Sequence, residues 1–198
     1  MAFDINELTS AQVKTTIQDL DGNALGSIDF LLATLYVNLT GAIVNSRVAQ
    51  DINGANEGTF TSGVVTLDLS PTDTETTGAH TLHLEWGYDA SANSTLSTPF
   101  DTSAADNTVT VNHTSHPFAV GDHVTFVDAT ETDGLNMNGT RTVATVPGAN
   151  SYTFEHPSPA TAGVTGGGGA SVAYFVGSKV GRDDIDLTIS PFVKVPTE

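Results

Sequence analysis

The fold class is clearest in residues 107–154, which read NTVTVNHTSHPFAVGDHVTFVDATETDGLNMNGTRTVATVPGANSYTF. Within it, apolar residues alternate with polar ones in three short runs, which are Val109 with Val111, Val124 with Phe126, and Tyr152 with Phe154. A period of two places every second side chain on the same face, as in a β-strand with one buried face. The stretch therefore predicts three short strands.

Turn-forming residues separate these runs. They adopt a positive φ or hold a fixed φ, as a reversing chain requires, and they occur at Pro117, Gly121-Asp122, Asp133-Gly134, Asn138-Gly139 and Pro147-Gly148. Short strands joined by tight turns predict a small antiparallel barrel or sandwich.

The first half of the chain carries further strand patterns. Alternation indicates strands around residues 13–17, 28–39, 65–69 and 82–86, with Trp86 as a core residue. The Asp19–Asn23 segment predicts a turn, and residues 49–61, which are rich in Asn, Gly and Asp, predict a loop. The chain is thus expected to be all-β.

The C-terminal strand pattern decides the domain organisation. Ile185, Leu187 and Ile189 alternate with polar residues, and such a strand needs a partner, for which residues 82–86 are the natural choice. We therefore predict a host domain of residues 1–96 completed by 174–198, with residues 97–173 inserted between its strands. Gly166 to Gly169 would be a flexible return linker. Two tandem domains with a C-terminal tail are the alternative.

The composition excludes several classes of partner. The 198 residues include 23 acidic and 6 basic ones, for a net charge of -17. This charge disfavours direct nucleic-acid binding and attachment to an anionic membrane, and it favours solubility. There is no cysteine, so disulfides and thiolate sites are excluded.

The chain shows no targeting or membrane segment in its sequence. MAFDINELTS at the start has no basic region and no apolar run, so we predict no secretory signal. The longest apolar run, FLLATLYV at 30–37, is far shorter than the ~20 residues that span a bilayer. We expect a soluble protein that is made in the cytosol.

The insert resembles a module found in structural proteins of tailed bacteriophages. The resemblance rests on His116-Pro117 followed by Gly121-Asp122-x-Val124, then Asn138-Gly139-x-x-x-Val143, and then Asn150-x-Tyr152-x-Phe154. The module implies a small β-barrel and a role in assembly.

The host segments resemble a family of phage virion proteins. The similarity lies in Ala33-Thr-Leu-Tyr36, Ile43-Val-Asn-Ser-Arg47, Pro71-Thr-Asp-Thr74 and Glu85-Trp86. Relatives carry a short hairpin after the Trp strand, whereas this chain carries the insert there. The resemblance implies an immunoglobulin-like antiparallel β-sandwich with the small β-barrel domain inserted.

Candidate metal ligands are better explained as structural residues. His113, His116 and His123 could hold zinc, but no Cys or suitably spaced Glu completes the set, and His116 occupies a packing position of the phage module. Asp19-Leu-Asp-Gly-Asn23 opens like a calcium loop, but its twelfth position is Phe30 rather than an acidic residue. Irregular Ca²⁺ sites remain open at two acidic groups, Asp183-Asp184 with Asp186 and Asp128 with Glu131 and Asp133.

No residue set predicts catalysis. The four glycines lack the following helix and lysine of a phosphate-binding loop, and no Ser-His-Asp arrangement can be assigned. We therefore predict no catalytic residue, no cofactor, no metal and no enzymatic activity.

The resemblances predict a non-enzymatic structural protein of the virion, made in the cytoplasm of a bacterial host. Capsid decoration or cement, or a neck or tail accessory role, is favoured. Its partners would be the major capsid protein or neck and tail proteins, in a homo-oligomer or symmetric array. The candidate contact residues are apolar and lie in two segments, at Phe30, Leu32, Tyr36, Phe192, Val193 and Val195.

Two alternatives remain open for the function. One is a receptor- or carbohydrate-binding module on a spike or fibre, which predicts exposed aromatic residues around Tyr152 and Phe154. The other is a tail-tube subunit, whose acidic lumen would repel DNA.

Overall fold

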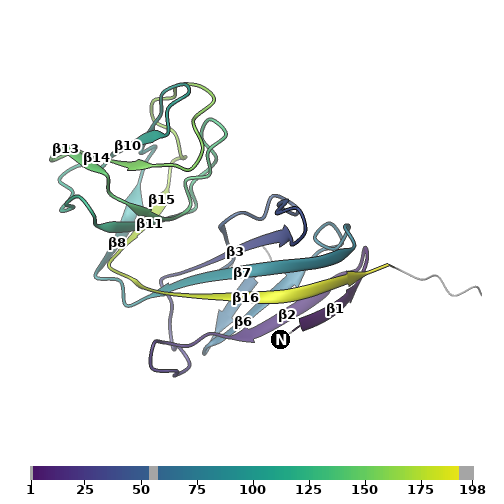
Figure 1. Cartoon of the computed structure of the whole chain (residues 1–198). Helices are drawn as coiled ribbons and strands as arrows, with labels where there is room; N and C mark the ends of the chain where they lie inside the picture. Colours follow the sequence, from purple (N-terminus) through teal and green to yellow (C-terminus); the bar gives the residue numbers. More distant parts are fainter. Residues whose placement is uncertain (1, 54–57, 192–198) are drawn as a thin grey trace, which may run out of the picture. The chain divides into compact units, whose positions relative to one another are not determined.

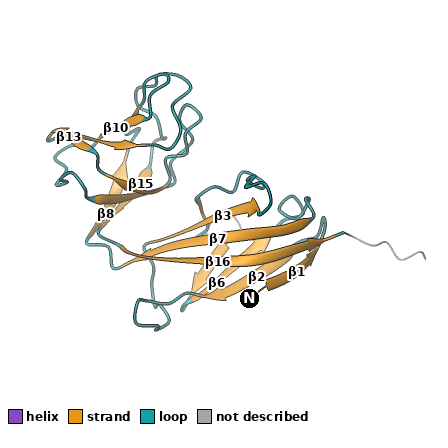
Figure 2. Ribbon diagram, in the orientation of Figure 1, coloured by secondary structure: helices purple, strands orange, loops and turns teal. Residues whose placement is uncertain are grey.

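The computed structural model describes residues 2–53 and 58–191, and the regular structure in these ranges is β-strand throughout (Figures 1 and 2). The chain divides into two compact units. The first consists of Met1–Tyr88 and Val180–Glu198, and the second of Asp89–Lys179. The all-β prediction is confirmed.

The first unit is a sandwich of two sheets. One sheet has the order β1-β16-β7-β3-β4, formed by Ala2–Asn6, Lys179–Ser190, Gly78–Tyr88, Phe30–Val37 and Gln50–Asp51. The other has the order β2-β6-β5, formed by Ala11–Thr16, Val64–Leu69 and Gly58–Thr61. Side chains from both sheets share one core, including Val13, Leu35, Leu67, Leu84 and Leu187. The β-sandwich that the resemblance implies for the host domain is therefore present.

The C-terminal strand lies where the sequence predicts it. β16 neighbours β7 in the sheet, so the Leu82–Trp86 pattern and the Ile185–Ile189 pattern are adjacent (Figure 1). β1 adds a parallel edge strand to β16, with Ile5 opposite Ile189. β7 and β16 thus meet in one sheet although the second unit separates them in the chain.

The region between β3 and β6 differs from the expectation. The segment predicted as loop at 49–61 contains the two short strands β4 and β5. β4 pairs with β3 through Leu32 and Ala33. Such short strands are specified by their partners, not by their own sequence, and they extend the edges of both sheets.

The second unit contains two four-stranded sheets. One has the order β13-β14-β10-β9, formed by Thr145–Gly148, Ser151–Glu155, Thr108–Asn112 and Phe100–Asp101. The other has the order β12-β11-β15-β8, formed by Gly139–Thr142, His123–Val127, Val172–Val176 and Ala92–Leu96. Phe100, Phe126 and Phe154 meet edge to face or tilted in the shared core, with centroids 5.1–6.3 Å apart. The three predicted strands of this region are confirmed as β10, β11 and β14.

The small barrel expected for this region is not closed. In the described part of the chain its strands form two separate sheets. β8 pairs with β15, with Leu96 opposite Val172 and Ala92 opposite Val176. Because of this pairing, β8 belongs to the second unit, although the sequence prediction assigned residues 89–96 to the host domain. That the unit is an inserted domain able to fold alone stays a prediction.

The glycine run at Gly166–Gly169 is not a linker between the units, which corrects the sequence prediction. Phe100 and Gly167 exchange two backbone hydrogen bonds, of 2.7 and 3.2 Å. Gly168 has φ +93°, and a Cβ there would lie 2.5 Å from the Phe100 ring. The glycines therefore allow the backbone to pack closely against the core of the second unit.

Candidate functional site

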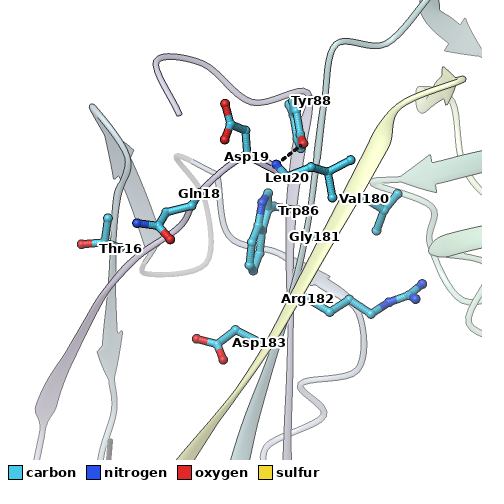
Figure 3. Close-up of a pocket in the computed structure, with 10 residues that line it drawn as sticks. All are labelled: Thr16, Gln18, Asp19, Leu20, Trp86, Tyr88, Val180, Gly181, Arg182 and Asp183. Atoms are coloured by element: carbon cyan, nitrogen blue, oxygen red, sulfur yellow. Dashed lines mark hydrogen bonds between the residues drawn. The ribbon is translucent and has the colours of Figure 1, made fainter. Parts of the chain in front are cut away.

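A cleft of about 500 Å³ lies in the first unit (Figure 3). It is lined by residues from the end of β2 and the segment after it, from the end of β7 and from the start of β16, namely Thr16, Gln18, Asp19, Leu20, Trp86, Tyr88, Val180, Gly181, Arg182 and Asp183. Its volume falls in the range of small-molecule sites, about 300–1,000 Å³. The cleft therefore lies at one end of the sandwich, between β7 and β16 of one sheet and the chain that follows β2 of the other.

Strand alternation explains why Asp183 lines the cleft. It lies on the same side of β16 as the buried residues Ile185 and Leu187, which face the core. Asp183 is exposed because it precedes them, at the end where the two layers part. A core-facing position at the open end of a sandwich thus carries a carboxylate.

Trp86 forms the floor of the cleft. Only 6% of its surface is exposed, and Gly181 lies so close that a Cβ there would be 2.3 Å from the indole ring. The indole Nε1 is buried and has no hydrogen-bond partner among the described residues. An unpaired buried donor costs about 1–3 kcal/mol. The core role predicted for Trp86 is confirmed, and its nitrogen is left unsatisfied.

The wall opposite β16 is a rigid turn. The Tyr88 hydroxyl accepts a 3.0 Å hydrogen bond from the Leu20 N–H. The Asp19 carboxylate accepts hydrogen bonds from the N–H groups of Asp21 and Asn23, at 2.9 and 2.8 Å. Bonds from the backbone and side chain of Asn23 hold the pKa of Asp19 below its usual value. The predicted Asp19–Asn23 turn is confirmed, and its carboxylate is occupied by the turn itself.

The remaining polar side chains of the cleft differ in their availability. Arg182 donates through Nε to Glu85 at 2.8 Å, and in Figure 3 it points away from Gln18 and Asp183. The Thr16, Gln18 and Asp183 side chains form no hydrogen bond with other described residues. In Figure 3, Gln18 lies to the left of the Trp86 ring and Asp183 lies below it. The cleft therefore presents a hydroxyl, an amide and a carboxylate that are unoccupied by protein groups.

A buried ion pair lies elsewhere in the same unit. Arg47 donates to both carboxylate oxygens of Asp73, through Nε at 2.6 Å and through a terminal nitrogen at 2.8 Å. Asn45 donates to the same carboxylate, and Ser70 does so through its N–H and its hydroxyl. Burial raises the pKa of Asp73, but these hydrogen bonds outweigh burial and hold the pKa below its usual value. Two of the segments that resemble phage virion proteins, around Arg47 and around Asp73, are thus joined by one network.

This network supports a set of loops, at residues 7–10, 38–49 and 70–77, which we call the loop end. The Leu8 N–H donates to the Thr74 carbonyl at 3.1 Å, and Thr74 directly follows Asp73 in the chain. Leu8, Asn45 and Ser46 have positive φ, an uncommon conformation outside glycine. The loop end also exposes aliphatic side chains, with Leu8 58%, Leu39 94% and Ile43 43% exposed. Hydrogen bonds therefore hold its backbone, while the Leu8, Leu39 and Ile43 side chains face solvent.

The predicted contact residues are in part core residues. Phe30 and Leu32 are 1% and 2% exposed, and the Phe30 ring packs directly against Gly87 of the neighbouring strand β7. Tyr36 is half-buried. Phe192, Val193 and Val195 lie outside the described residues. The contact surface proposed from β3 is thus wrong for Phe30 and Leu32.

The histidines of the second unit are packing residues. His116 Nε2 lies 3.0 Å from the carbonyls of Gly148 and Ser151, and its Nδ1 accepts from the Phe118 N–H at 3.2 Å. Because Nδ1 accepts, Nε2 is the nitrogen that donates to the two carbonyl oxygens. His123, by contrast, lies by Thr142, with its Nδ1 3.1 Å from that hydroxyl. Within residues 2–53 and 58–191, no group of three His, Asp or Glu side chains is arranged to hold a metal ion.

His113 and Tyr152 share an aromatic cluster with His116, Phe118 and Tyr174. Burial, and secondly the adjacent His116, lowers the pKa of His113. Burial and the nearby Tyr174 raise the pKa of Tyr152. Tyr152 and Phe154 are each 1% exposed, so the exposed aromatic cluster expected there is absent. Both side chains face inward, because they are two residues apart on β14 and so share the face that packs in the core of the second unit.

Over the described residues, no helix has the length and apolar character needed to cross a membrane. No protein-family model matches the chain. No curated protein matches it either. Among solved structures, one chain titled "Phage phi92 endosialidase" is similar, with a TM-score of 0.39 and 20% identity. The match covers 54% of this chain and 16% of that chain, and a likeness of this extent supports no conclusion about function.

Proposed function

We propose that the protein is a non-enzymatic structural component of a tailed-phage virion, acting through protein–protein contacts as a decoration, cement, neck or tail accessory protein. The observation that carries this proposal is the Arg47–Asp73 pair. It joins the Ile43–Arg47 and Pro71–Thr74 segments, on which the resemblance to phage virion proteins rests. The motif residues thus meet in one place and hold loops in a fixed shape.

The loop end is the contact surface that we propose. Leu8, Leu39 and Ile43 supply exposed apolar area. The buried hydrogen bonds between Arg47 and Asp73 hold the loops that carry them together, so little conformational entropy is lost on docking. Its charged side chains with some exposure, Glu7 and Glu75, are acidic, and Arg47 is buried. A partner surface with an apolar depression surrounded by Lys and Arg would be complementary. In a symmetric particle many such contacts add up, even when each is weak.

Immunogold labelling of purified phage particles tests the proposal. With an antibody against the recombinant protein, we expect label on the head, or at the neck or tail. Label on disrupted particles alone would place the protein inside the virion. The absence of label on both intact and disrupted particles would refute the virion assignment.

Substitutions at the loop end test the contact surface separately. A Leu8→Ser and Leu39→Ser double variant should assemble into particles at less than about one tenth of the wild-type level, since two exposed anchors are lost. Val120→Ser is the matched control, because Val120 is 66% exposed but lies in the second unit. Equal incorporation of both variants would refute the loop end as the contact surface.

A further inference from the structure

We propose that the cleft beside Trp86 binds a neutral, hydroxyl-rich ligand of the saccharide class. The inference is independent of the virion assignment, since it rests on the chemistry of one unit of the purified chain.

The unpaired groups of the cleft select this chemistry. Thr16 and Gln18 can each donate and accept a hydrogen bond, whereas Asp183 only accepts when ionised. A sugar hydroxyl also donates and accepts, so adjacent hydroxyls can satisfy all three side chains. A simple cation would use only their acceptor oxygens.

The charges of the cleft favour a neutral ligand over an anionic one. Asp19 and Asp183 are both carboxylates, and the guanidinium of Arg182 is engaged by Glu85 at 2.8 Å. Among the described residues that line the cleft, no free cation is therefore available to bind a phosphate or a ligand carboxylate. The lowered pKa of Asp19 keeps its negative charge over a wide pH range.

The apolar lining suits the C–H surfaces of a sugar ring. Trp86 and Tyr88 expose 6% and 5% of their surfaces, and Leu20 and Val180 add aliphatic surface beside them. Because the aromatic rings offer edges instead of whole faces, we expect a dissociation constant on the order of 1 mM.

The chain contains a single tryptophan, so one signal reports on the cleft. In a ¹H–¹⁵N spectrum of the full chain, the indole N–H of Trp86 gives one resonance. We would titrate glucose, galactose, N-acetylglucosamine and lactose separately, each to about 20 mM. At least one sugar should shift this resonance saturably.

Variants of exposed residues show whether the response comes from the cleft. Asp183→Ala and Gln18→Ala should each weaken binding tenfold or more. Asp186→Ala is the matched control, because Asp186 is exposed on the same strand but does not line the cleft, and it should bind as the wild type does.

Three outcomes would overturn the inference. The first is that no sugar shifts the resonance, and the second is that the cleft variants bind as the control does. The third is a response to trilysine in place of sugars, which would make the cleft a docking site for a basic protein segment. The labelling experiment is unaffected by any of these results, so failure here is distinguishable from failure of the virion assignment.

Discussion

Removing the Asp73 carboxylate should destabilise the first unit strongly. In Asp73→Ala, the Arg47 guanidinium loses its two hydrogen bonds to the carboxylate while its side chain remains 3% exposed. Asn45 and Ser70 also lose an acceptor. Breaking a buried ion pair by deleting one partner costs about 3–5 kcal/mol, a large part of the stability of an ordinary domain.

The assay is urea unfolding followed by tryptophan fluorescence. Trp86 is the only tryptophan, so the signal reports on the first unit alone. Asp68→Ala is the control, because Asp68 is exposed and accepts one hydrogen bond from Gln12 at 2.7 Å. It should lose less than about 1 kcal/mol. A loss below about 1 kcal/mol for Asp73→Ala as well would refute the structural role of the pair.

The same pair gives a pH dependence with a definite sign. The folded pKa of Asp73 lies below its unfolded value, so the unfolded chain binds a proton more readily. The stabilisation is therefore complete above the unfolded pKa of about 3.9 and is lost as the pH falls through the folded pKa. As the pH is lowered from 5 to below the folded pKa of Asp73, the free energy of unfolding of Asp73→Ala should fall less than that of the wild type. Identical slopes would contradict this prediction.

Three further predictions concern the second unit. Gly168→Ala should destabilise the second unit by about 1–3 kcal/mol, because residue 168 has φ +93° and a Cβ there would clash with the Phe100 ring. Gly148→Ala is the control, because a Cβ at residue 148 would enter open space. Thermal unfolding followed by circular dichroism compares the two variants. The pKa of His113 is lower in the folded state, so the unfolded state binds a proton at a higher pH and the free energy of unfolding falls as the pH drops below about 6.5. His113→Phe should reduce that fall in stability. An unchanged dependence of stability on pH would contradict the prediction. Residues 89–179 expressed alone should unfold cooperatively. Replacing them with a short Gly-Ser bridge should leave the rest of the chain folded. A molten first unit after this replacement would contradict the inserted-domain interpretation.

The strands that could be predicted are those whose own pattern is complete. β6, β7, β10, β11, β14 and β16 each alternate apolar and polar residues, and each buries the predicted face. β4 has two residues and β5 four, too few to show a period. Likewise, the glycine run gives no sign of Phe100, because the contact that orders it is not local.

The candidate site followed less directly from the sequence. The alternation along residues 82–86 predicts Trp86 as a core residue, and the sequence offers Asp183 only as a member of an acidic group. Nothing in the sequence marks Gln18 as a site residue, because it belongs to the segment after β2. It lines the same cleft as Asp183 only because the two sheets pack together. The alternation along β16 was the one available clue, since it places Asp183 on the core-facing side.

The pairing of residues 185–189 with residues 82–86 could be inferred from the sequence, because an isolated C-terminal strand needs a partner. The all-β class and the turns follow more directly. These depend on a period of two and on backbone preferences, which are local properties of the chain. The three-dimensional structure was needed to show that Phe30 and Leu32 are buried, that Arg47 pairs with Asp73, and that a cleft lies beside Trp86. Burial and pairing depend on what covers each side chain, and that is set by segments distant in the sequence.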